Sequence, residues 1–147
     1  MDLDLLDLYG RASDWTSTKV VGAASQLDGP TTCDGWDVRT LLNHMLQTQR
    51  YFVGAARGEP GVIDKTGPAL AIAFSDQLLH GWDLALSTGR ESTMPDGLPD
   101  AAYSLIHGRF TEEQRKGVFK PEILVGPDAS AQDRLLAYTG RDPSPPA

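Results

Sequence analysis

Residues 68–88 limit the possible folds more than any other stretch, because they are apolar around most of a helical circumference. Helical spacing leaves one polar stripe, formed by Asp76, His80 and Asp83 at positions i, i+4 and i+7. A helix that is apolar on most sides is usually buried, so this one needs neighbours packed around it. Pro68 suits the first turn of such a helix, and Gly89 suits the position just after its end.

The rest of the chain also favours helices over strands, since apolar residues recur at helical spacing and β alternation is absent. Asp96 can cap a helix, and Thr111 begins a capping box. The expected elements are helices over residues 3–27, 37–57, 68–88, 96–110, one turn from 111, and 130–138, with an extended segment at 121–126. We therefore predict an all-α fold, most simply a four-helix bundle with a short C-terminal helix. It would form a single domain over residues 1–140, followed by a flexible tail over 141–147.

Composition excludes several classes of protein. The 147 residues carry a net charge of −7 without a basic cluster, which argues against a nucleic-acid partner. No apolar stretch is long enough to span a membrane, and the acidic N-terminus does not resemble a signal peptide. The single cysteine, Cys33, excludes an internal disulfide and a multi-cysteine zinc site. A cytoplasmic protein is the expectation.

The polar stripe has two interpretations. A carboxylate and an imidazole one turn apart on a buried helix need a partner, and a metal ion satisfies both Asp76 and His80. His44 lies beside the apolar stripe of its own helix and could face a groove shared with helix 68–88. Alternatively, the stripe is an ordinary solvent-facing surface with an i, i+4 ion pair, and His44 is a surface histidine. His107 has no partner at useful spacing, so we interpret it as a surface or packing residue.

Cys33 precedes a helix start, where a thiol pKa can be lowered, but it has no basic or histidine neighbour in sequence. We therefore interpret Cys33 as a small structural residue.

Two segments carry a family resemblance. TTCDGWDVRTLLNHM (31–45) and DQLLHGWDLA (76–85) resemble motifs of the DinB/YfiT-like superfamily, closest to the mycothiol-dependent maleylpyruvate isomerase-like metal-binding branch of actinobacteria. The ending DRLLAYTGRDP (133–143) is similar to that branch as well. The resemblance implies a four-helix bundle that holds a divalent metal through His44, Asp76 and His80. Zinc is the first expectation, with nickel or another divalent ion as alternatives.

In this superfamily the metal activates a low-molecular-weight thiol such as mycothiol, so the resemblance implies thiol transfer or isomerisation with a small thiol or electrophile as partner. Asp83 would orient a ligand imidazole or serve in packing. The sequence identifies no residue as a general acid or base, and Tyr51 is only a weak candidate. The chain departs from the branch in the short segment RGEPGVIDKTG (57–67), where members usually carry an additional helical segment. The isomerase's extra C-terminal domain is also missing from this sequence.

Three hypotheses follow. The protein is a metal-dependent enzyme that uses a thiol, a metal- or small-molecule-binding protein without turnover, or a structural relative that dimerises without metal. We also expect a homodimer. A helix that is apolar on most sides must be buried, and in a short chain a second copy of the protein could supply part of the surface that buries it.

Overall fold

The computed structural model describes residues 4–56 and 66–144, which form six α-helices and one short 3-10 helix. The expected all-α class is therefore confirmed. The chain divides into two compact units, Met1–Pro95 and Asp96–Ala147, and each is described by itself below. The expectation of a single domain over 1–140 stays a prediction. Among the described residues, no helix is both long and apolar enough to cross a membrane.

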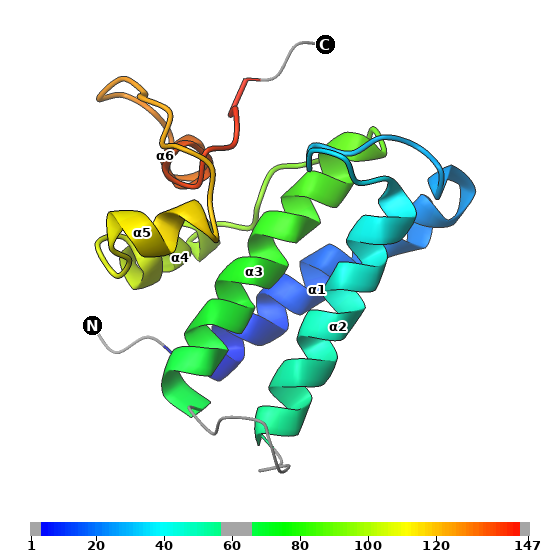
Figure 1. Cartoon of the computed structure of the whole chain (residues 1–147), viewed down its shortest axis with the longest axis horizontal. Coiled ribbons are helices and arrows are strands. Elements are labelled where there is room, and N and C mark those ends of the chain that lie inside the picture. Colours follow the sequence, from blue (N-terminus) through cyan, green and yellow to red (C-terminus); the bar gives the residue numbers. More distant parts are fainter. Residues whose placement is uncertain (1–3, 57–65, 145–147) are drawn as a thin grey trace. The chain divides into compact units, whose positions relative to one another are not determined.

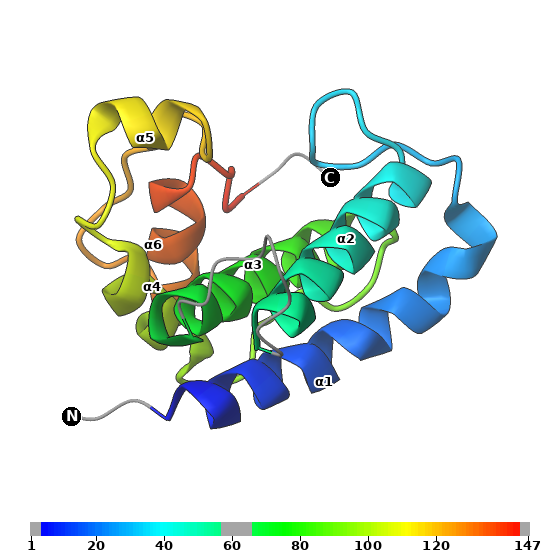
Figure 2. The same ribbon diagram turned by 60° about the horizontal axis from the view of Figure 1, so that its bottom comes forward.

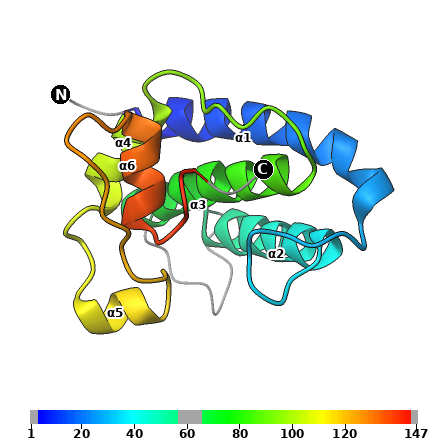
Figure 3. The same cartoon turned by 90° about the horizontal axis from the view of Figure 1, so that it is seen from above.

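Three long helices make up the first unit. They are α1 (Leu5–Ala23), which continues into the 3-10 helix η1 (Ala24–Gln26), α2 (Val38–Ala56) and α3 (Thr66–Ser87). The three helices are labelled in Figure 1; α3 packs against both α1 and α2, and Figure 3 shows it between them. Its side chains Phe74, Leu78 and Leu84 are completely buried. The apolar circumference predicted for this stretch is thus covered on two sides within the unit.

Helices α1 and α3 approach each other closely near Gly81. A Cβ atom at Gly81 would collide with the Thr16 hydroxyl and would come within 2.8 Å of the Trp15 ring. The buried Thr16 hydroxyl donates a hydrogen bond of 3.0 Å to the Gln77 carbonyl of α3. The absence of a side chain at Gly81 therefore sets the spacing of this helix pair.

The ends of α2 and α3 follow the sequence signals. Asp37 accepts a hydrogen bond of 2.8 Å from the Thr40 amide and so caps the start of α2. Gly89, with a φ of +69°, follows the end of α3. The Arg90 amide donates to the Ala85 carbonyl at 2.8 Å, as in a Schellman cap. The first helix ends earlier than expected, because its last turn tightens into η1 instead of continuing to residue 27.

Figure 2 shows the segment between η1 and α2 as a long loop beside the start of α2. Pro30 and Asp37 pair as an isolated antiparallel bridge. Beneath this segment lies an apolar cluster of buried side chains from the helices, against which Cys33 and Trp36 pack; its buried members are Ala23, Val38, Leu41, Met45 and Leu84. The loop is therefore fixed by apolar contacts as well as by hydrogen bonds.

The second unit contains three shorter helices, α4 (Leu98–Ile106), α5 (Glu112–Lys116) and α6 (Ala131–Tyr138), and α4 packs against α6. The Thr111 capping box and the final helix are confirmed. The predicted Asp96 cap is wrong, because Gly97, with a φ of +83°, takes the N-cap position and lets the chain turn directly into Leu98.

The segment 121–126 forms no strand. One of its amides, that of Ile123, donates a hydrogen bond of 2.9 Å to the Ala137 carbonyl. The predicted loop 57–67 lies outside the described residues except for its last two positions, which begin α3. Residues 145–147 of the predicted tail also lie outside them.

Candidate metal centre

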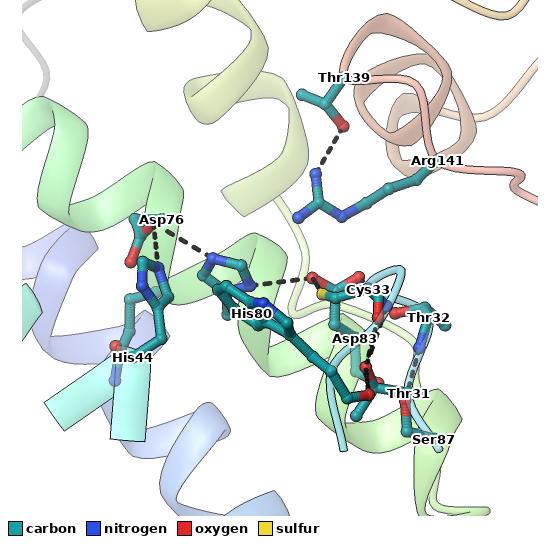
Figure 4. Close-up of polar contacts among 12 residues, drawn as sticks. Thr31, Thr32, Cys33, His44, Asp76, His80, Asp83, Ser87, Thr139 and Arg141 are labelled. Atoms are coloured by element: carbon teal, nitrogen blue, oxygen red, sulfur yellow. Dashed lines mark hydrogen bonds and ion pairs between the residues drawn. The ribbon is translucent and has the colours of Figure 1, made fainter. Parts of the chain in front are cut away.

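His44, Asp76 and His80 meet where α2 faces α3. His44 lies on the second turn of α2, and Asp76 and His80 lie one turn apart on α3, so their side chains converge across the helix pair (Figure 4). The rings of His44 and His80 meet edge to face with centroids 4.9 Å apart. His44 therefore faces the α3 surface that carries the polar stripe, as the helical spacing suggested.

The donor atoms of these three residues all lie within 4.8 Å of one another. His80 Nε2 is 3.4 Å from Asp76 Oδ1, and His44 Nε2 is 3.9 Å from the same oxygen. A tetrahedral zinc ion with bonds of about 2.0–2.2 Å separates two nitrogen or oxygen ligands by about 3.3–3.5 Å. The His80–Asp76 pair already has that spacing, and His44 would move toward Asp76 by about half an ångström to meet it. The residues thus fit a three-ligand divalent metal site.

Asp83 fixes the orientation of the His80 ring. Its carboxylate Oδ2 lies 2.9 Å from His80 Nδ1, and its side chain is only 1% exposed. With a hydrogen on Nδ1 donating to Asp83, the lone pair of Nε2 is directed toward the side of Asp76. Such a carboxylate partner is the usual way to orient a metal-binding imidazole, which supports the orienting role predicted for Asp83.

The electrostatics of the cluster favour a bound cation. Burial disfavours the charged form of Asp76, but hydrogen bonds and charge from His44 and His80 outweigh this effect and hold the Asp76 pKa well below its usual range. Burial likewise lowers the pKa of His80, but hydrogen bonding with the Asp76 and Asp83 carboxylates and with Cys33 outweighs this and raises it well above its ordinary value. Both carboxylates thus stabilise a positive charge on His80, and a metal ion bound there would supply positive charge at the same place.

Three further polar residues hold Asp83 and the loop beside it, and the sequence placed none of them at the site, since it led us to interpret Cys33 only as a structural residue. The Thr32 hydroxyl donates to Asp83 Oδ1 at 2.9 Å, and the Cys33 thiol lies 3.6 Å from Asp83 Oδ2. Ser87 accepts a hydrogen bond of 3.1 Å from the Thr32 amide. Ser87 continues the Asp76–His80–Asp83 stripe by one more turn, so extending the helical wheel would have found it. Thr32 and Cys33 come from a distant loop, and spacing along the chain carries no sign of their approach.

The remaining candidates fall outside this cluster. His107 is exposed and stacks on Tyr103 with ring centroids 4.7 Å apart, which confirms its interpretation as a surface or packing residue. Tyr51 is 49% exposed, and its ring contacts Phe52. Trp36, in contrast, lies against His44 with ring centroids 5.0 Å apart. Within residues 4–56 and 66–144, the contacts of these side chains assign none of them a role as general acid or base.

Comparison with known proteins matches part of the chain to a protein family. Residues 11–73 match the model of the mycothiol maleylpyruvate isomerase N-terminal domain family. The match confirms the resemblance expected from the sequence. The matched residues include His44 and end before Asp76 and His80. The searches of curated proteins and of solved structures found nothing that matches.

Proposed function

We propose that this protein binds one divalent metal ion through His44, Asp76 and His80, and that the bound metal holds a low-molecular-weight thiol for reaction with an electrophile. The observation that carries the proposal is the convergence of two imidazoles and one carboxylate from two helices, with all three donor atoms within 4.8 Å of one another. The match to a family named after mycothiol and maleylpyruvate suggests mycothiol as the first thiol to test.

Each residue would have a distinct role at this centre. Asp76 supplies negative charge, and the two imidazoles supply neutral nitrogen donors. Asp83 keeps His80 in the tautomer that leaves Nε2 free. The His44 side chain is 36% exposed, so the centre remains open on that side. A bound divalent metal would favour the thiolate form of a coordinated thiol, which is the reactive nucleophile.

The donor set guides the choice of metal. Two nitrogens and one oxygen suit zinc, which commonly keeps one position open when the protein supplies three ligands. The same donors accept nickel and other first-row ions, whose order of affinity follows the Irving–Williams series. We propose zinc as the resident ion.

Metal analysis tests the first half of the proposal. The full chain is stripped with a chelator, reloaded with zinc and analysed for bound metal per chain. We expect one zinc ion per chain in the wild type, and loss of that ion in His44→Ala, Asp76→Asn and His80→Ala. His107→Ala provides a matched control, because it removes an exposed histidine of the other unit. Equal zinc binding in His44→Ala and wild-type protein would exclude the site.

Conjugation of a thiol tests the second half. Zinc-loaded protein is incubated with mycothiol and a small electrophile such as maleylpyruvate, and products are followed by mass spectrometry. We expect product to form faster with wild-type protein than with His80→Ala. Stoichiometric zinc without any acceleration would favour a metal-binding protein without turnover.

A further inference from the structure

The two ring nitrogens of His80 face two different sets of donor atoms. On one side, Nε2 faces Asp76 and His44, which form the centre described above. On the other side, Nδ1 faces Asp83, and the thiol of Cys33 lies beside the same carboxylate oxygen (Figure 4). Sulfur, oxygen and nitrogen donors of Cys33, Asp83 and His80 also all lie within 4.8 Å of one another. His80 therefore belongs to two potential metal sites.

The position of Cys33 is fixed by its surroundings. Its amide donates a hydrogen bond of 3.0 Å to the Thr31 hydroxyl, and its carbonyl accepts one of 3.0 Å from the Trp36 amide. The neighbouring Thr32 is held to α3 through both its hydroxyl and its amide. Because the loop is held at these points, the thiol is presented to Asp83 by the fold.

The distances suit a tetrahedral ion with one sulfur ligand. For bonds of about 2.3 Å to sulfur and about 2.1 Å to oxygen, the two ligand atoms lie about 3.6 Å apart. The observed distance between Cys33 Sγ and Asp83 Oδ2 is 3.6 Å. The nitrogen–oxygen distance, about 3.3–3.5 Å around such an ion, is 2.9 Å between His80 Nδ1 and Asp83 Oδ2. An entering ion would widen this hydrogen-bonded pair by about half an ångström.

We propose that Cys33, Asp83 and His80 form a second metal site, selective for thiophilic cations such as cadmium. Thiolate donors favour soft cations, whereas the nitrogen and oxygen donors of the first site suit harder ones. The cation would take the place of the thiol proton and of the proton on Nδ1, the displaced protons would go to solvent, and the neutral imidazole would carry its one proton on Nε2, which faces Asp76. Because a neutral imidazole offers only one lone pair, an ion in either site excludes an ion from the other.

Cadmium titration of the metal-free full chain tests this site, since a thiolate bound to cadmium gives a characteristic ultraviolet charge-transfer absorption. We expect the absorption to rise to saturation at one equivalent in the wild type, and to be retained in His44→Ala and Asp76→Asn. Asp83→Asn should weaken cadmium binding by at least about tenfold, because the anionic donor is lost. The exposed carboxylate variant Asp14→Asn serves as the control for a change in net charge.

Two results would overturn the proposal. One is cadmium binding to the wild type without the thiolate absorption. The other is loss of the absorption in His44→Ala, which would place Cys33 in the first site. If Asp83→Asn does not fold, alkylation of Cys33 in His44→Ala decides the matter: one equivalent of cadmium should slow the reaction at least about tenfold, and an unchanged rate rejects the site. Zinc binding is also measured in Cys33→Ser, which should retain one zinc ion because Cys33 is not a ligand of the first site. The second site can therefore fail this test while the proposed function stands.

Discussion

Replacement of Asp83 by asparagine tests how strongly the buried carboxylate supports the first metal site. Asparagine keeps the size of the side chain and an oxygen that can accept from His80 Nδ1, but it removes the charge. The carboxylate lies 2.9 Å from Nδ1 and is 1% exposed, so water does not screen the interaction.

The expected loss follows from the two kinds of hydrogen bond. A hydrogen bond to a charged group contributes about 1.5–3 kcal/mol, and a neutral one contributes about 0.5–1.5 kcal/mol. The difference of about 1–2 kcal/mol corresponds to zinc binding that is about 5–30 times weaker. This range overlaps the loss of about 10–100-fold that is usual when the partner of a metal-binding histidine is removed.

The assay is competition for zinc between the protein and a chromophoric chelator, at fixed pH and ionic strength. Asp14→Asn is the matched control, because it makes the same chemical change at an exposed position of α1. Circular dichroism establishes that both variants fold. If Asp83→Asn binds zinc as tightly as Asp14→Asn does, Asp83 does not orient a metal ligand, and the argument from His80 Nδ1 is refuted.

Three other outcomes are expected. Zinc affinity should rise about tenfold per pH unit while His80 still holds its proton, because its raised pKa makes zinc compete with that proton; affinity measured from pH 6 to 8, without such a rise, would contradict this. Phe74→Ala should lower the free energy of unfolding in urea by about 3–5 kcal/mol, because the ring is completely buried; a loss under about 1 kcal/mol would mean the core is packed differently. Gly89→Ala should cost about 1–2 kcal/mol in the same assay, since its φ is +69°, and an unchanged midpoint would argue against the Schellman cap.

Local signals predicted most of the helices, because capping and apolar spacing act over a few residues. Gly89 marks the end of α3 as expected, and α2 begins at Val38, one residue after the predicted start. The boundary at Asp96 failed, since a glycine in the left-handed region competed with a side-chain cap one residue earlier. The sequence thus predicted that a helix forms more securely than it predicted the residue at which that helix begins.

The candidate site also has one part that the sequence predicts and one part that it does not. The stripe on α3 follows directly from helical geometry, and the facing position of His44 followed from its place on the wheel. The approach of Cys33 to Asp83 joins residues 50 positions apart, so it depends on how the loop packs on α3. Cys33 packs against the apolar cluster as a structural residue would, and it also contacts the carboxylate. Only the folded chain reveals this second contact.

The close approach at Gly81 links α1 to the chemistry of α3. Gly81 directly follows His80, and its empty side-chain position receives Thr16 of α1. Any bulk added at that contact would push the helices apart and carry the His80 backbone with them, since the next residue cannot move independently within a helix. A substitution on α1 could therefore change metal affinity without touching a ligand. Selection for variants with altered metal binding would be expected to yield changes at Thr16 and Gly81 as well as at the site itself.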